Sequence, residues 1–261
     1  MPIAKSHDGV EIHYKTHGRG PFQLIFLHGW GGSGETWEKV FGNLDPEMFR
    51  AIRLDLRGHG LSAKPAFGYT WEQFDQDVLA VADQESLTRF VPVGFSLGGK
   101  LSAYLAALYP HRVLAQILVA PVGPGLVPIE RSIGLQVCRE ANDKSKARAF
   151  FRNWFAPEAT EGIVDGCCSA IAETPAHVLK ATAEMILWTS IEPIVSRLQQ
   201  PTLLVLGTSD PVYGETYQRE RVVPFLANVH TTYISSGHFL PLERPADLAR
   251  SLSEFLLRCA S

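Results

Sequence analysis

The chain has no long hydrophobic run and no block of like charge. No apolar stretch approaches the length that spans a bilayer, and the first residues, MPIAKSHDGVEIHYK, lack the unbroken apolar core of a signal peptide. The 24 basic and 27 acidic residues are mixed along the chain and leave a formal net charge of −3. This distribution favours neither nucleic acid nor a membrane as a partner.

Cysteine is also scarce, with four residues in 261. Cys167 and Cys168 are neighbours, which makes a disulfide between them geometrically awkward, and the four cysteines show no zinc-like spacing. We therefore expect free thiols, no bound metal and a cytoplasmic location. A periplasmic or exported protein whose leader has been removed is the alternative.

Short β-type runs alternate with helical patterns along the chain. This alternation predicts an α/β fold with a mainly parallel sheet and helices on both faces. Residues 10–16 alternate apolar and polar side chains, as a half-exposed edge strand does. Four further runs are largely apolar, as strands buried on both faces should be: residues 22–27, 90–93, 117–120 and 202–206.

Apolar stripes at helical spacing lie between and after these strands. Trp71, Phe74 and Val78 share one face, and Thr70 with Gln73 fits a capping box. We expect this stripe and two others to lie in the core: Leu97, Leu101, Leu105 and Leu108, then Leu248, Leu252, Phe255 and Leu256.

The alternation stops at about residue 121 and resumes near residue 192. Helical patterns at 147–155 and 178–189 occupy the interval without a convincing strand, and Thr174–Pro175 fits a cap followed by proline at the first helical position. We therefore predict a core of residues 1–121 and 192–261 and a helical cap, or lid, of residues 122–191. Most of its large side chains are expected to pack its own small core and a few to line an acyl pocket: Trp154, Phe155, Met185 and Trp188.

The strongest local motif is Gly94-Phe95-Ser96-Leu97-Gly98-Gly99, between a predicted strand and a leucine-striped helix. A serine hydroxyl is a poor nucleophile and must be held where a base can take its proton. A sharp strand-to-helix turn exposes the serine but crowds its backbone, and glycines two residues before and after relieve the crowding. Ser96 is therefore the predicted nucleophile.

An acid and a base follow later strands. Asp210 comes after the apolar run 202–206, and His238 comes after the run 231–234. Functional groups in open α/β sheets gather at the carboxyl ends of the strands, and the chain order Ser96, Asp210, His238 is the order expected for a serine elbow of this type. The alternatives are that Asp210 only forms a turn before Pro211 and that His238 is a satisfied loop histidine.

Backbone N–H groups are expected to stabilise the oxyanion. One donor is Leu97, directly after the nucleophile, and the second is Trp30, in the glycine loop after the strand at residues 22–27. His28 is expected to brace that loop by hydrogen bonding. Asp55 also ends a strand, but it precedes the serine in the chain, so we interpret it as structural.

The same loop invites a different interpretation. Residues 29–34, GWGGSG, read as G-x-G-x-x-G after a strand, and Asp55 follows about 20 residues later, as in a dinucleotide-binding site. That interpretation leaves Ser96, Asp210 and His238 unexplained and puts a bulky Trp at the tight turn. A hydrolase explains all of these features, so we prefer it.

Taken together, the motifs resemble those of the α/β-hydrolase superfamily over residues 10 to 258, apart from the insertion. The branch of small carboxylesterases that includes pimeloyl-carrier-protein methyl ester esterase is similar, as are enol-lactonases. The resemblance implies Ser96, Asp210 and His238 as a triad, Trp30 and Leu97 as oxyanion donors, and a helical cap. It rests on HGWG at 28–31, DLRGHG at 55–60, GFSLGG at 94–99, Asp210 and Gly237-His238.

Three positions separate this chain from parts of the superfamily. Pro92 lies inside the predicted central strand, where its missing N–H predicts a local irregularity. Phe95 stands where His or Trp is often found beside the nucleophile, which changes the floor of the pocket. Ser96 excludes the epoxide hydrolase and haloalkane dehalogenase branches, which use an aspartate there.

The sequence therefore predicts an esterase or lactonase that acts on a small molecule through an acyl-enzyme, without a metal or organic cofactor. The alternatives on the same triad are a carbon–carbon bond hydrolase and a cofactor-free perhydrolase, because fold and triad do not set the substrate. A ligand-sensing receptor with little turnover is a third. Five side chains are predicted to contact the substrate: Trp30, Phe95, Phe239, Trp154 and Trp188.

Overall fold

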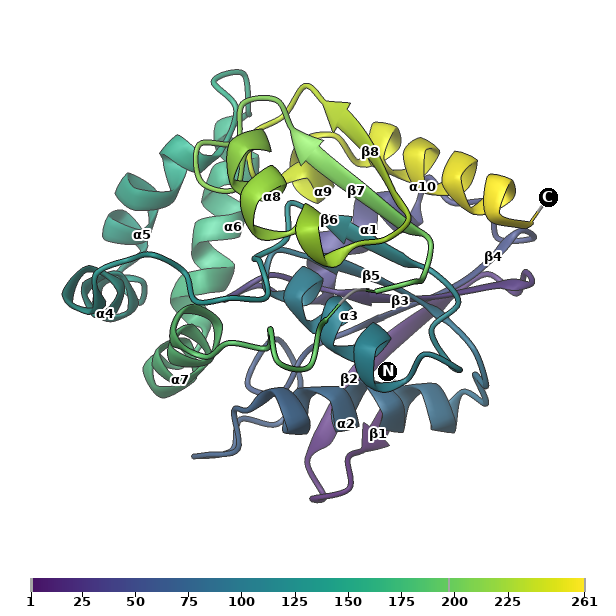
Figure 1. The fold of residues 1–261 in the computed structure, drawn as a ribbon. Helices are drawn as coiled ribbons and strands as arrows, with labels where there is room; N and C mark the ends of the chain where they lie inside the picture. Colours follow the sequence, from purple (N-terminus) through teal and green to yellow (C-terminus); the bar gives the residue numbers. More distant parts are fainter. Residues whose placement is uncertain (1, 197, 261) are drawn as a thin grey trace.

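The computed structural model describes residues 2–196 and 198–260, in which eight strands form one sheet (Figure 1). Their order across the sheet is β1-β2-β4-β3-β5-β6-β7-β8. The strands are β1 (Ile3–Lys5), β2 (Glu11–His17), β3 (Phe22–Leu27), β4 (Phe49–Leu54), β5 (Val91–Phe95), β6 (Gln116–Val119), β7 (Thr202–Gly207) and β8 (Val229–Ile234).

All pairings from β4 across to β8 are parallel, and only β1 and β2 run antiparallel to their neighbours. The predicted mainly parallel sheet is therefore confirmed. The prediction that residues 10–16 form an edge strand is wrong, because β1 pairs with the first half of β2 and β4 with the second half. A strand as short as β1 has too few residues for its alternation to be recognised in the sequence.

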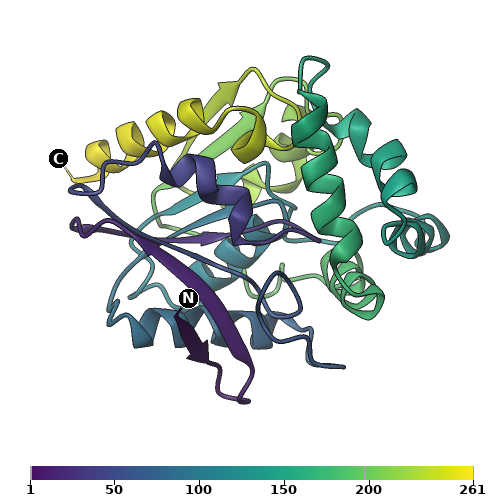
Figure 2. The ribbon, with the colours of Figure 1, turned by 180° about the vertical axis from the view of Figure 1, so that it is seen from behind.

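Helices cover both faces of the sheet, as predicted (Figures 1 and 2). On one face, α2 (Trp71–Gln84) and α3 (Leu97–Leu108) contribute to one hydrophobic cluster; on the other, α1 (Glu38–Phe41) and α10 (Pro245–Ala260) contribute to a second. The Thr70 side chain accepts a hydrogen bond from the Gln73 N–H at 3.4 Å and so caps α2. The apolar stripes of these helices lie in the core except at Leu108, which is 41% exposed at the end of α3.

Smaller elements connect the strands after β3 and β7. A 3-10 turn, η1 (Gly34–Trp37), precedes α1; α8 (Glu215–Arg221) and η3 (Val223–Phe225) lie between β7 and β8; and α9 (Leu240–Glu243) precedes α10. No helix in the described part of the chain has both the length and the apolar character needed to cross a membrane. The four cysteines are free, and a cytoplasmic location stays a prediction.

Residues 122–191, here called the helical segment, lie together at one end of the sheet (Figure 1). All of these residues are described, and they form helices and connecting loops but no strand. The helices are α4 (Arg131–Glu140), α5 (Lys144–Phe151), η2 (Arg152–Trp154), α6 (Glu161–Glu173) and α7 (Ala176–Trp188). The helical patterns at 147–155 and 178–189 thus correspond to α5 with η2 and to α7.

The predicted cap at Thr174–Pro175 is wrong by one residue. Thr174 is the C-cap of α6, and Pro175 is the N-cap of α7 rather than its first residue. The Thr174 hydroxyl instead lies 3.2 Å from the Gly31 carbonyl and 3.1 Å from the Ala170 carbonyl. It therefore bonds its own helix and the glycine loop that follows β3.

Pro92 lies inside β5, as predicted, and the expected irregularity is present beside it. Phe90 bridges Val113 on one side of Pro92, whereas Val93 pairs with Ile117 on the other. The register between these two segments therefore slips by one residue. A proline cannot donate to the ladder, so the slip occurs where a bond would be missing in any case.

Lys100 joins the core to both ends of the helical segment. Its side chain is buried on α3, and Nζ donates to the carbonyls of Gly125 (3.0 Å), Ile186 (3.1 Å) and Thr189 (3.0 Å). The Trp71 ring lies 5.4 Å from the same nitrogen. Burial lowers the pKa of Lys100 to about 7.

Replacing Lys100 by Met is expected to destabilise the protein by about 2–4 kcal/mol at pH 7, because three buried carbonyls lose their donor. Unfolded lysine titrates near 10.4, so the unfolded state binds more protons than the folded state between pH 7 and about 10. This group therefore adds stability as pH rises, and the difference between wild type and Lys100→Met should grow by roughly 1–2 kcal/mol from pH 7 to 9. Urea unfolding at both pH values measures it, and a difference that shrinks with pH would contradict the expectation.

Candidate active site

Ser96 occupies a strained turn between β5 and α3. Its backbone has φ +54° and ψ −111°, in the left-handed half of conformational space that residues other than glycine seldom adopt. The turn is held by hydrogen bonds from the Ser96 N–H to the Val119 carbonyl at 3.0 Å and from the Val122 N–H to the Ser96 carbonyl at 3.2 Å. The neighbouring strand β6 therefore helps to keep the serine in this conformation.

The glycines around Ser96 are required by space rather than by their own φ angles. A Cβ on Gly94 would lie 2.0 Å from the Gly98 carbonyl oxygen, and one on Gly98 would lie 2.2 Å from the Leu27 carbonyl oxygen. The turn brings β5, α3 and the end of β3 so close together that no side chain fits between them. This is the crowding that the G-x-S-x-G spacing predicts.

Asp210 and His238 meet at the carboxyl ends of β7 and β8. His238 Nδ1 lies 2.8 Å from Asp210 Oδ2, and both side chains are buried. The other carboxylate oxygen, Oδ1, accepts the N–H groups of Val212 (2.8 Å) and Tyr213 (3.0 Å). Asp210 thus forms a turn, as the alternative interpretation had it, and still presents one oxygen to the histidine.

These contacts keep the Asp210 carboxylate ionised. Burial alone would raise its pKa, but the interaction with His238 and the two backbone N–H bonds outweigh burial, so the pKa lies below its ordinary value. An ionised acceptor favours a proton on His238 Nδ1 and leaves Nε2 free to accept one.

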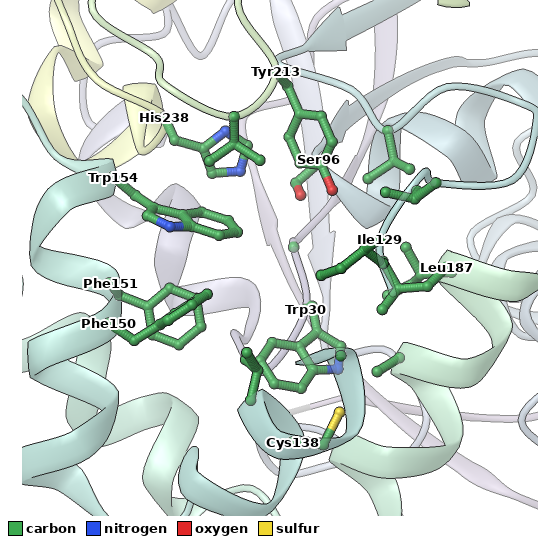
Figure 3. Close-up of a pocket in the computed structure, with 18 of the residues that line it drawn as sticks. Trp30, Ser96, Ile129, Cys138, Phe150, Phe151, Trp154, Leu187, Tyr213 and His238 are labelled. Atoms are coloured by element: carbon green, nitrogen blue, oxygen red, sulfur yellow. The ribbon is translucent and has the colours of Figure 1, made fainter. Parts of the chain in front are cut away.

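Ser96 and His238 face the same pocket, with Tyr213 beside them (Figure 3). The hydrogen bonds of the described residues join His238 to Asp210 but do not join Ser96 Oγ to His238. Hydrogen bonds between a nucleophile and its base are often long before substrate binds. The lack of this bond is therefore compatible with a serine and a histidine that act together in one pocket.

The backbone N–H groups of Trp30 and Leu97 are unbonded, in contrast to many of their neighbours. Neither N–H donates to any acceptor in the described part of the chain, and Gly29 and Trp30 line the same pocket as Ser96. Trp30 is fixed from the other side, because its indole N–H donates to the Leu179 carbonyl of α7 at 3.0 Å. The two N–H groups are therefore available to a ligand.

His28 and Asp55 brace this loop, as predicted. His28 lies 2.8 Å from the Gly29 carbonyl through Nδ1 and accepts the Leu56 N–H through Nε2 at 3.0 Å, and burial lowers its pKa to about 4. The Asp55 carboxylate accepts the N–H groups of Gly34 and Leu61, both at 2.7 Å. These oxygens are occupied by the protein's own backbone, which argues against a role in binding a ribose.

The pocket has a volume of about 350 Å³ and is largely apolar. Of the side chains predicted to contact a substrate, Trp30, Phe95, Trp154 and Phe239 line it. Trp188 does not line it among the described residues; it lies at a separate surface hollow, under the Arg131 guanidinium at 4.8 Å from the ring. Periodicity places Trp188 on α7 but does not tell which side of the helix faces inward.

Glu243 was missed by the sequence analysis. Its Oε2 accepts the N–H groups of Gly237 (3.2 Å) and Ala156 (2.8 Å), and its Oε1 accepts the N–H of Phe239 (3.1 Å). The only signal in the sequence is an acidic residue five positions after His238, and nothing in that spacing indicates which backbone groups it would accept.

Comparison with known proteins decides the family. A model of the alpha/beta hydrolase family matches residues 24–251. The chain belongs to the α/β-hydrolase family. Membership removes the dinucleotide-binding interpretation of the glycine loop.

Three curated relatives of this α/β-hydrolase differ in how much they share with it. A dihydrolipoyllysine-residue acetyltransferase component of an acetoin cleaving system from Cupriavidus necator is 38% identical over 45% of the chain, but the match spans only 31% of that protein. A putative non-heme chloroperoxidase from Synechocystis is 28% identical, over 87% of the chain and 88% of the relative. 3-Oxoadipate enol-lactonase 2 from Acinetobacter baylyi is 27% identical, over 78% and 77%.

Solved structures confirm the fold of the α/β-hydrolase. An esterase from Exiguobacterium antarcticum superposes with a TM-score of 0.89 at 21% identity, covering 98% of both chains. The enol-lactonase from Burkholderia xenovorans superposes with a TM-score of 0.88 at 24% identity, covering 98% of this chain and 100% of its own.

The turn at Ser96 makes a matched pair of predictions. Gly98→Ala should destabilise the protein by about 2–4 kcal/mol, because its Cβ would overlap a backbone oxygen that cannot move freely. Gly166→Ala is the control: it lies within α6 with nothing within 4 Å of its Cβ, and should stabilise the protein by about 0.5–1 kcal/mol. Urea unfolding distinguishes them, and equal effects would show that the elbow tolerates a side chain.

Proposed function

We propose that this α/β-hydrolase is a serine esterase or lactonase that works through an acyl-enzyme. The observation that carries the proposal is the buried Asp210–His238 pair, whose histidine lines an apolar pocket together with Ser96 on its strained turn. Relatives named as an esterase and enol-lactonases support an ester or lactone as the substrate.

In the proposed first step, Ser96 Oγ attacks the carbonyl carbon while His238 Nε2 takes the hydroxyl proton. Asp210, which stays ionised, holds the imidazole in the required tautomer and stabilises the imidazolium. The tetrahedral intermediate collapses as the C–O bond to the alcohol breaks, and His238 returns the proton to the departing oxygen. The acyl group remains on Ser96.

In the second step, His238 takes a proton from water, and the hydroxide attacks the acyl carbon. The second tetrahedral intermediate breaks its bond to Ser96 Oγ, which recovers its proton from His238. The acid leaves, and a lactone would leave as a single hydroxy acid. Water is the only reactant in this step besides the acyl-enzyme.

The unbonded N–H groups of Trp30 and Leu97 are the proposed oxyanion donors in both steps. Each such donor is typically worth about 3–4 kcal/mol of barrier, since it points at charge that develops only in the transition state. Residues 122–191 are proposed to act as the cap, because side chains of α4, α5, α6 and α7 line the pocket above Ser96.

A perhydrolase activity at the same site is the second candidate. Hydrogen peroxide would then replace water as the acceptor of the acyl group. A relative named as a bifunctional esterase/perhydrolase, from Acinetobacter calcoaceticus and 35% identical over 50% of the chain, favours it, and nothing in the pocket distinguishes the two acceptors. The first step, acylation of Ser96, is the same in both.

Ser96→Ala is expected to lower ester turnover by about 10⁵–10⁶-fold while leaving the free energy of unfolding nearly unchanged, since the nucleophile acts as a unit with its base. Hydrolysis of short p-nitrophenyl esters measures the first quantity and urea unfolding the second. A fluorophosphonate should label the wild type and not this variant.

The control is Ser209→Ala, because Ser209 is exposed, is adjacent to Asp210 in the chain and has no role in the proposed mechanism. It should keep both labelling and turnover. An active, well-folded Ser96→Ala variant would reject the proposed mechanism.

A further inference from the structure

The pocket beside Ser96 is lined without formal charge. No Lys, Arg, Asp or Glu is among the described residues that form its walls. Its polar side-chain groups are the hydroxyls of Ser96, Tyr213 and Tyr217, the His238 ring, the Cys138 thiol and two indole N–H groups. Burial raises the pKa of Cys138 to about 11 and raises that of Tyr213 and Tyr217, so none of these groups becomes an anion near neutral pH.

Three arginines of the helical segment have partners outside the pocket. Arg131 lies over the Trp188 ring, outside the pocket. Arg148 pairs with Glu161 and Asp165, and Arg152 donates to the Ala156 and Pro157 carbonyls. A carboxylate on a bound acyl group would find no cation on the pocket wall and would lose its hydration.

Tyr213 contributes a hydroxyl to the pocket. Tyr213 is buried, its ring lies 5.4 Å from the His238 ring, and its hydroxyl faces the cavity close to Ser96 (Figure 3). That hydroxyl makes no hydrogen bond within the part of the chain that the structure describes, whereas the Tyr217 hydroxyl accepts the Gly123 N–H at 3.0 Å. Because this hydroxyl faces the cavity and has no partner among the described residues, it can donate a hydrogen bond to an oxygen of a bound ligand.

We propose that the substrate carries an uncharged, largely hydrocarbon acyl group and that an oxygen of the bound substrate accepts a hydrogen bond from Tyr213. This inference rests on the proposed ester or lactone hydrolysis and narrows its substrate class. It excludes acyl groups that end in a carboxylate, and it makes Tyr213 a specificity residue at the reacting end of the pocket.

Ethyl hexanoate and monoethyl adipate provide the test, because their acyl groups have equal length and differ by a terminal carboxylate. The value of kcat/KM should be at least about 100-fold higher for the hexanoate, since burying an unpaired carboxylate is strongly unfavourable. Comparable rates would overturn the inference and leave the esterase intact. Turnover of neither ester, with no fluorophosphonate labelling of Ser96, would instead reject the proposed function.

Binding to Ser96→Ala gives a readout that does not depend on turnover. Ethyl hexanoate should raise the melting temperature of this variant, and monoethyl adipate should not. A matched pair of substitutions adds a gain of function: Leu187→Lys places a cation on the pocket wall, and Leu126→Lys places one on an exposed site outside it. Only the first should raise kcat/KM for monoethyl adipate, and an equal effect of both would count against the inference.

Tyr213→Phe tests the hydrogen bond. It should lower kcat/KM for ethyl hexanoate by about 3–10-fold, the loss expected for one neutral hydrogen bond. Tyr233→Phe is the control, because the Tyr233 hydroxyl is exposed and bonds Glu215 at 3.1 Å away from the pocket. Unchanged kcat/KM in a folded Tyr213→Phe protein would remove Tyr213 from the proposal.

A separate observation concerns Glu243. Its carboxylate accepts the N–H groups on both sides of His238, from Gly237 and Phe239, and also that of Ala156 in the helical segment. The His238 N–H donates in turn to the Trp154 carbonyl at 2.6 Å. The backbone of residues 237–239 is therefore linked to the helical segment in two ways: directly to Trp154, and through the Glu243 carboxylate to Ala156.

We infer that Glu243 is a positioning residue for His238. Through its bond to Ala156, the position of the imidazole depends on the position of residues 154–156. In Glu243→Gln the amide nitrogen cannot accept, so at least one of the three N–H groups loses its partner. We expect kcat to fall by about 10-fold with KM within 2-fold, and the rate of fluorophosphonate labelling to fall in parallel.

The matched control is Glu254→Gln, an exposed carboxylate on α10. It should leave kcat, KM and labelling unchanged. An unaltered kcat in folded Glu243→Gln protein would overturn the inference. So would a loss of activity that only follows the fraction of folded protein, since that indicates a structural role alone.

Discussion

Backbone crowding at Ser96 is the constraint on which the site depends. The turn from β5 into α3 forces a positive φ on the serine and brings Gly94 and Gly98 against backbone oxygens. The same turn places the Ser96 hydroxyl and the unbonded Leu97 N–H together at the edge of the sheet, near the loop that carries Trp30. Strain of this kind persists only when the surrounding structure holds it, and here bonds to Val119 and Val122 do so.

The sequence is informative where local chemistry decides the outcome. Four of the strands, β3, β5, β6 and β7, are largely apolar, the cap of α2 depends on residues three apart, and the elbow depends on glycines at fixed offsets, so each could be predicted. The meeting of Asp210 with His238 could also be predicted, because parallel strands end at one edge of a sheet.

Other features depend on contacts between distant segments. Trp188 and Met185 are both large apolar residues of α7, and the spacing does not tell that both line the surface hollow rather than the pocket beside Ser96. Nothing near Lys100 in the chain indicates that its three acceptors come from residues 125, 186 and 189. Nothing in the sequence indicates that Glu243 contacts Ala156 and the loop that carries His238.

The indole of Trp30 has a wider consequence. Because it bonds the Leu179 carbonyl, the loop that presents one proposed oxyanion donor takes its position from α7 as well as from the sheet. Exchanging the helical segment between homologues would therefore change the position of this loop as well as the residues that line the pocket. A chimaera would inherit a differently seated indole, so its rate on a common ester would change even where the two cavities were identical in shape.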